Sequence, residues 1–96
     1  MDIKCIISLM LYFINELKIA IKGGDGFSVE NAIKIYTKDT ELGINIESII
    51  LYCICGADYK LLLRSYGEYK NNKIKEYEIE FNGGKIIKIY FDISNY

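Results

Sequence analysis

Residues 73–94 read Lys-Ile-Lys-Glu-Tyr-Glu-Ile-Glu-Phe-Asn-Gly-Gly-Lys-Ile-Ile-Lys-Ile-Tyr-Phe-Asp-Ile-Ser, and this stretch decides the fold. Polar and apolar residues alternate along it, which predicts strands over 73–81 and 85–93, because successive side chains of a strand point to opposite faces. The intervening Asn82, Gly83 and Gly84 favour a type I turn that ends with a glycine in the left-handed conformation. The chain is therefore predicted to end in an antiparallel hairpin.

The same alternation predicts how the two strands of the hairpin pair. Setting Phe81 opposite Lys85 brings the two apolar faces together and leaves the three-residue turn between them. This register also sets Glu78 opposite Lys88 on the solvent face, a pair worth about 0.2–1 kcal/mol. On the buried face it pairs Tyr77 with Ile89 and Ile79 with Ile87.

Length and composition indicate one soluble domain over residues 1–96. The 96 residues are too few for two independent cores, while 51% apolar and 26% charged residues allow a core and a polar surface. The 12 basic and 13 acidic residues give a net charge of −1. Nucleic-acid binding is not expected, because phosphate recognition requires a basic excess or patch.

A helix is predicted over residues 1–22. Its polar residues form one narrow strip, so the broad apolar remainder must be covered by the sheet, by loops or by another subunit. A buried strand over 3–7 followed by a shorter helix is the alternative interpretation. The apolar run 5–14 is too short to span a membrane and lacks the basic start and cleavage site of a signal peptide.

A glycine-rich segment is expected to end this helix. Asp25 can close an Asx turn on the backbone, and Ser28 can cap a short helical turn over 29–32. Residues 23–26 do not match a phosphate-binding loop, because the required glycine, lysine and serine or threonine spacing is missing. The residues assigned to this structural turn are Gly24, Asp25, Gly26 and Ser28.

The middle of the chain predicts a short strand over 32–36, a loop over 37–43, and then a second helix. This helix covers 44–55 and ends at Gly56, because apolar residues recur there at helical spacing, at Ile46, Ile49, Ile50, Cys53 and Ile54. A strand over 59–66 and a long polar turn over 67–72 lead into the hairpin. The predicted fold is α+β, with two helices packed on an antiparallel sheet of three or four strands.

Catalysis, cofactors and metals are not expected. The chain has no histidine, which removes the commonest general base and zinc ligand. Cys5, Cys53 and Cys55 are odd in number and lie in apolar segments, which indicates unreactive thiols of a cytoplasmic protein. A carboxylate- or metal-dependent enzyme using Asp25 and Asp92 is the alternative, although Asp92 is expected to lie on the solvent face near Ile74 or to bond a loop backbone.

Two motifs carry a resemblance to a known family. The first is Gly24-Asp25-Gly26-x-Ser28-x-Glu30-Asn31-Ala32-Ile33 and the second is the closing Ile89-Tyr90-Phe91-Asp92-Ile93-Ser94. They resemble a family of small uncharacterised bacterial proteins with a Gly-Asp-Gly-x-Ser-x-Glu-x-Ala-Ile motif and a C-terminal Tyr-Phe-Asp-Ile strand. The resemblance covers about residues 23–94 of the family-like region 23–96. It implies an α+β fold without an established activity. Phe27 and the Cys55-Gly56 helix end depart from the family pattern.

The function predicted first is a non-enzymatic protein-interaction module that works through a Tyr- and Glu-bearing sheet face or through the apolar helix over 1–22. A negative strip attracts a basic partner, and tyrosine is frequent in interface hot spots. One concrete form is a small acidic inhibitor of the immunity or anti-defence (anti-CRISPR-like) type that occupies a nucleic-acid groove of its target. A structural homodimer sealed by the helix over 1–22 is a further alternative. The candidate interaction residues are Glu76, Glu78, Glu80, Tyr66, Tyr69 and Tyr90.

Overall fold

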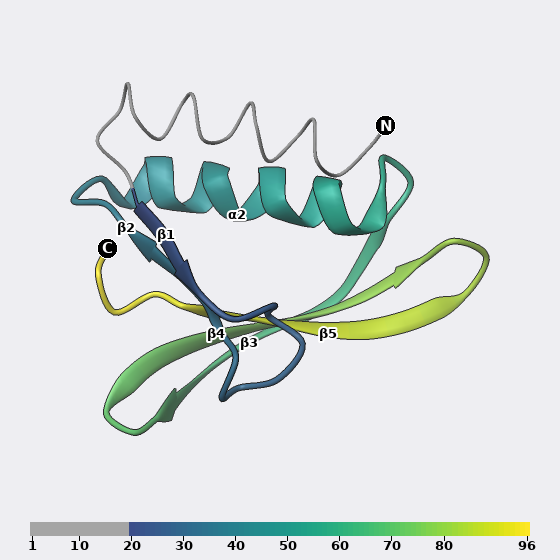
Figure 1. Ribbon diagram of the computed structural model, residues 1–96. Coiled ribbons are helices and arrows are strands. Elements are labelled where there is room, and N and C mark those ends of the chain that lie inside the picture. Colours follow the sequence, from purple (N-terminus) through teal and green to yellow (C-terminus); the bar gives the residue numbers. More distant parts are fainter. Residues whose placement is uncertain (1–19) are drawn as a thin grey trace.

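The computed structural model describes residues 20–96, in which one helix packs on one face of a five-stranded sheet (Figure 1). The fold is therefore α+β, as predicted. Residues 1–19 lie outside the described part, and with them Cys5, most of the predicted helix over 1–22, and its alternative strand over 3–7. The elements in chain order are β1 (Ala20–Gly23), β2 (Ile33–Tyr36), α2 (Thr40–Cys55), β3 (Lys60–Tyr69), β4 (Asn72–Phe81) and β5 (Lys85–Asp92).

The sheet is mixed, with the strand order β1-β2-β5-β4-β3. The prediction was an antiparallel sheet of three or four strands. Instead, β2 runs parallel to β5 and pairs antiparallel with β1 on its other side. The chain reaches this arrangement because α2, β3 and β4 intervene between β2 and β5, which leaves room for the crossover that a parallel pair requires.

The end of the predicted N-terminal helix is wrong, because residues 20–22 belong to β1. Ile21 lies opposite Ile35 of β2 and packs against the core. A β-branched residue fits either a helix or a strand in a short apolar segment, and the free edge of β2 supplies backbone partners that decide for the strand.

The C-terminal hairpin has the predicted register. Phe81 lies opposite Lys85, and Glu78 lies opposite Lys88. The turn geometry differs from the expected type I turn, because Asn82 already has a φ of 49° and the two glycines that follow are also positive. Turns with positive φ match the right-handed twist of the flanking strands, which explains the difference.

The hairpin of β3 and β4 closes more tightly than predicted. Instead of a long turn over 67–72, the pairing continues to Tyr69 and Asn72, and only Lys70 and Asn71 form the turn. Their φ values are 49° and 67°, as in the two-residue turns that join twisted strands. β3 is consequently ten residues long.

Helix α2 begins four residues before the predicted start. Asp39 caps it, with its Oδ1 accepting a hydrogen bond from Leu42 N at 3.2 Å, so the predicted loop over 37–43 is wrong in its last part. Gly56 ends the helix as predicted, at a φ of 82°. The buried side of α2 is also rotated from the expected one, because Ile49 is 46% exposed. The buried residues are Gly43, Ile46, Glu47, Ile50 and Leu51.

The loop between β1 and β2 forms turns and no helical turn. Asp25 Oδ1 accepts a hydrogen bond from Phe27 N at 3.0 Å, which closes an Asx turn. Ser28 does not cap a helix over 29–32; its carbonyl accepts from Asn31 N and its hydroxyl from Asn31 Nδ2. Gly26 has a φ of 84° and its carbonyl accepts from Tyr90 N at 2.8 Å, so this turn is joined to β5.

The core lies between α2 and the sheet. Ile35, Ile79, Ile89 and Phe91 have no exposed surface, and the Tyr77 ring meets Phe91 edge to face at 5.7 Å. No helix within residues 20–96 has the length and hydrophobicity needed to cross a membrane.

Candidate functional site

Helix α2 covers one face of the sheet (Figure 1), and strand alternation places the predicted acidic row on the opposite face. Glu76, Glu78 and Glu80 alternate with Tyr77 and Ile79 along β4, so the three carboxylates project on the side opposite the core. We call this row and its cross-strand neighbours the acidic face. From Glu76 to Glu80, the neighbours are Tyr90, Lys88 and Ile86 on β5 and Ser65, Leu63 and Lys60 on β3.

The acidic face has apolar flanks. Leu63 of β3 is 54% exposed and Ile86 of β5 is 58% exposed, although both are large aliphatic residues. A β-bulge between Leu61 and Leu63 shifts the β3 register at this point. Exposed aliphatic groups beside a charged row combine the apolar contact and the electrostatic selection that protein interfaces use.

Polar contacts order one end of the row. Glu76 accepts a hydrogen bond from Ser65 Oγ at 3.1 Å and lies 4.0 Å from Lys88 Nζ. Lys88 lies opposite Glu78 in register but approaches the diagonal Glu76. The hydrogen bond and charge of Glu76, with some burial, raise the pKa of Tyr90. The Glu78 and Glu80 carboxylates make no ion pair with any described residue.

The structure divides the predicted tyrosines between two faces. Tyr90 lies opposite Glu76 on the acidic face. Tyr69 lines a pocket of about 260 Å³ at the Asn72 end of β4. Lys70 Nζ lies 5.3 Å from the centre of the Tyr69 ring. Tyr66 lies opposite Lys75 and so belongs to the other face, with 64% of its surface exposed.

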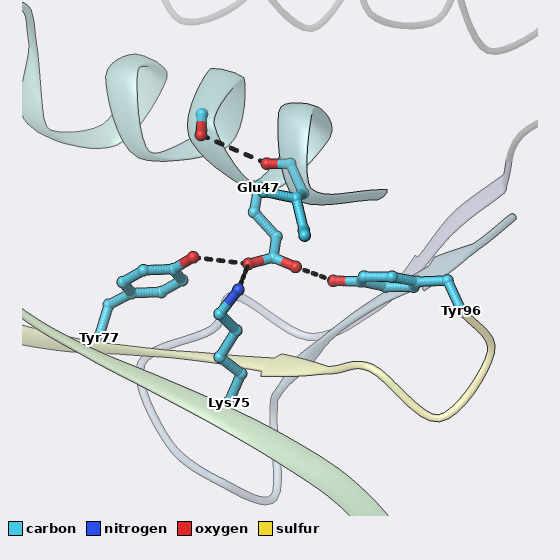
Figure 2. A network of polar contacts seen from close by, with 6 residues as sticks. Glu47, Lys75, Tyr77 and Tyr96 are labelled. Atoms are coloured by element: carbon cyan, nitrogen blue, oxygen red, sulfur yellow. Dashed lines mark hydrogen bonds and ion pairs between the residues drawn. The ribbon is translucent and has the colours of Figure 1, made fainter. Parts of the chain in front are cut away.

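A buried polar cluster, which the sequence analysis missed, joins α2 to the sheet (Figure 2). Glu47 of α2 has no exposed surface, and its Oε1 lies 2.8 Å from Lys75 Nζ and accepts from Tyr77 OH at 2.7 Å. Its Oε2 accepts from Tyr96 OH. A sequence signal for the cluster existed, because Lys75 shares the strand alternation of Tyr77 and Glu47 has helical spacing to Gly43 and Leu51.

Burial and pairing set the protonation of this cluster. Burial lowers the pKa of Lys75, but the hydrogen bond and charge of Glu47 more than compensate, so this pKa lies above its ordinary value. Burial and the hydrogen bond to Glu47 raise the pKa of Tyr77 to about 12. The same causes raise the pKa of Tyr96. The cluster therefore combines a buried ion pair with two neutral phenols.

The other candidates for chemistry have structural roles. Burial raises the pKa of Cys53 and Cys55, which disfavours reactive thiolates. Asp92 lies opposite Ile74 and accepts from Ser94 N at 3.0 Å, as expected, but it is buried and not on a solvent face. Within residues 20–96, no three His, Cys, Asp or Glu side chains gather to hold a metal ion.

The structural turn residues lie in two separate places. Gly24, Asp25, Gly26 and Ser28 form the β1–β2 loop, and Asn82, Gly83 and Gly84 close the β4–β5 hairpin beside Glu80. None of the known protein families, curated proteins and solved structures compared with the chain matches it. The resemblance based on the two end motifs therefore stays a prediction.

Proposed function

We propose that this protein is a non-enzymatic protein-interaction module that binds a basic partner through its acidic face. The observation that carries the proposal is the row of Glu76, Glu78 and Glu80 between the exposed Leu63 and Ile86. Glu78 and Glu80 make no ion pair within the described chain, so their charges are free to meet Lys or Arg side chains of another protein.

The arrangement of titratable groups supports a binding function over an enzymatic one. The cluster with the strongest pKa shifts is buried between α2 and β4, where Glu47 and Lys75 satisfy each other. A catalytic group must reach its substrate, whereas Glu47 and Lys75 are buried and pair with each other. The concrete form we favour is an acidic inhibitor that covers the nucleic-acid groove of a basic target.

The test is affinity purification from the native host with the full chain as bait. The double variant Glu78→Gln/Glu80→Gln removes two charges and keeps the shapes of both side chains. We expect the wild-type chain to retain a Lys- and Arg-rich protein at low salt and to release it at high salt, because exposed charges are screened. The double variant is expected to lose this protein.

Glu41→Gln is the matched control, because Glu41 is exposed in the first turn of α2, away from the acidic face. It should retain the partner as the wild-type chain does. Recovery of the same partner with the Glu78→Gln/Glu80→Gln variant, or retention that is independent of salt, would contradict the proposal.

A further inference from the structure

Strand β3 is the outermost strand of the sheet and presents a long edge. The order β1-β2-β5-β4-β3 leaves its outer side without a partner strand among the described elements. β3 has ten residues, whereas the opposite edge strand β1 has four. Natural sheets protect edges with short strands, bulges or charged side chains. On β3 the bulge between Leu61 and Leu63 interrupts only the first part of the strand, and the charges beyond it, Arg64 and Glu68, have opposite signs. Residues 63–69 continue without interruption, and we call them the β3 edge.

The hairpin geometry determines which backbone groups of this edge are free. Tyr69 and Asn72 flank a two-residue turn, and such flanking residues form a hydrogen-bonded pair. Alternation along the ladder then directs the N–H and C=O groups of Arg64, Tyr66 and Glu68 outward. These three residues form the template for a further antiparallel strand.

The side chains of the β3 edge are complementary to themselves. Arg64 and Glu68 have opposite charges and lie symmetrically on either side of Tyr66, on one face of the strand. Tyr66 is 64% exposed, and its ring lies 5.7 Å from Lys75 Nζ. Leu63 on the other face is 54% exposed. Apolar groups and paired charges of this kind favour association with another strand.

We propose that the β3 edge pairs antiparallel with the β3 edge of a second copy of this chain. The two-fold axis passes through Tyr66, so that Tyr66 faces the partner's Tyr66. Arg64 then faces the partner's Glu68, and the same ion pair forms a second time by symmetry. On the opposite face Leu63 meets the partner's Tyr69, and Ser65 meets the partner's Gly67. Both outward-pointing backbone rows are satisfied in this register.

Neighbouring registers are less favourable, because they set like charges against each other or place a charge opposite the bulge. A two-fold axis at Arg64 sets Arg64 against its own copy, and an axis at Gly67 sets Arg64 against the partner's Lys70. An axis at Ser65 sets Glu68 against the partner's Leu62, inside the bulge. Within residues 63–69, only the axis at Tyr66 gives two opposite-charge pairs.

The dimer joins two five-stranded sheets into one continuous sheet and removes the β3 edge from solvent. Its interface is isologous, so it closes with two copies and does not propagate. The two-fold axis is perpendicular to the sheet, which places both acidic faces on the same side. The proposal does not depend on the proposed function, because Arg64 and Glu68 lie on the other face from Glu78 and Glu80.

Solution mass by light scattering or sedimentation, with the full chain, tests the proposal. We expect the 11.1 kDa chain to double its mass with rising concentration between about 1 µM and about 500 µM, a range suited to an interface below the standard size. Arg64→Glu and Glu68→Arg each create two like-charge contacts, and each should weaken association at least about 100-fold.

Charge exchange distinguishes this interface from any other. Equimolar Arg64→Glu and Glu68→Arg chains should form a heterodimer when mixed, because each pair again has opposite charges. The double variant Arg64→Glu/Glu68→Arg should dimerise alone for the same reason. Circular dichroism checks that every variant is folded.

Four results would overturn the proposal. The first is a wild-type chain that stays monomeric over the whole concentration range. The second is a pair of folded single variants that associate as tightly as wild type. The third is a mixture of the two single variants that remains monomeric while the wild-type chain dimerises. Assemblies that grow beyond two copies would also contradict a closed two-fold interface.

Discussion

Glu47 is a charged residue at the centre of an apolar helix face, and three polar groups contact its carboxylate. Lys75 neutralises its charge, and the hydroxyls of Tyr77 and Tyr96 occupy further acceptor sites (Figure 2). The ring of Tyr96 lies where a Cβ at position 43 would be, so Gly43 is required for this approach. Removing one partner of a buried ion pair is more costly than never having had the pair, because the other charge remains buried.

Glu47→Gln should therefore lower the free energy of unfolding by about 3–5 kcal/mol. The amide keeps one acceptor oxygen for either the Tyr77 or the Tyr96 hydroxyl, but its NH2 group cannot accept from the other. The Lys75 ammonium also loses its counter-charge in a site with 3% exposure. Urea unfolding followed by circular dichroism measures the loss.

Glu41→Gln serves as the control, because Glu41 is exposed and its substitution should change stability by less than about 0.5 kcal/mol. Equal losses in the two variants would show that the buried pair contributes nothing beyond a surface carboxylate.

At the scale of elements, the ends of helices and strands depended on single polar residues. Asp39 caps α2, which begins four residues before the predicted start at 44, because the Asp39 carboxylate satisfies a free N–H of the first turn. Asn71 allows β3 and β4 to meet in a two-residue turn, because asparagine tolerates positive φ better than most residues. Both boundaries come from local chemistry and not from hydrophobic periodicity.

Asp39→Ala is expected to destabilise the protein by about 1 kcal/mol, since it leaves the Leu42 N–H without its 3.2 Å partner. Asp39→Asn keeps an acceptor oxygen and should lose only a few tenths of a kcal/mol. Thermal and urea unfolding of the two variants measure the difference. If Asp39→Asn were as unstable as Asp39→Ala, the charge near the helix dipole, and not the hydrogen bond, would explain the effect.

For the whole molecule, the buried cluster makes stability depend on alkaline pH. The pKa of Tyr77 rises from 10.0 to about 12 on folding, and that of Lys75 rises as well. Groups with raised pKa contribute stability that is complete below the unfolded value and is lost as pH rises through the folded value. Stability should be flat up to about pH 9.5 and fall from about pH 10 upward, and the Tyr77 shift corresponds to about 3 kcal/mol.

Tyr77→Phe removes one of these titrating groups, so its stability should fall less steeply with pH than that of the wild-type chain. Urea unfolding at about pH 8, 10 and 11 measures both slopes. Tyr52→Phe is the control, because Tyr52 is 43% exposed on α2. Equal slopes for Tyr77→Phe and the wild-type chain would contradict the prediction, because they would show that the Tyr77 hydroxyl has the same pKa in the folded and the unfolded chain.

Much of the fold was predictable where the pattern was local. The alternation over 73–93 predicts the hairpin, its register and the row Glu76, Glu78 and Glu80, because one face had to be apolar throughout. Helical spacing predicts α2 and its end at Gly56. The five-stranded mixed sheet was not predictable, because β1 and β2 are four-residue strands that acquire their partners only when the chain has folded back.

The sequence by itself determined the α+β class, the acidic face of β4 and the absence of histidine chemistry, because periodicity and composition act without long-range contacts. Only the tertiary structure decided the rest. It separated Tyr66 from the acidic face, buried Glu47 against Lys75 and placed β3 at the edge of the sheet. These features arise from contacts between residues far apart in the chain, and such contacts depend on which elements become neighbours in space.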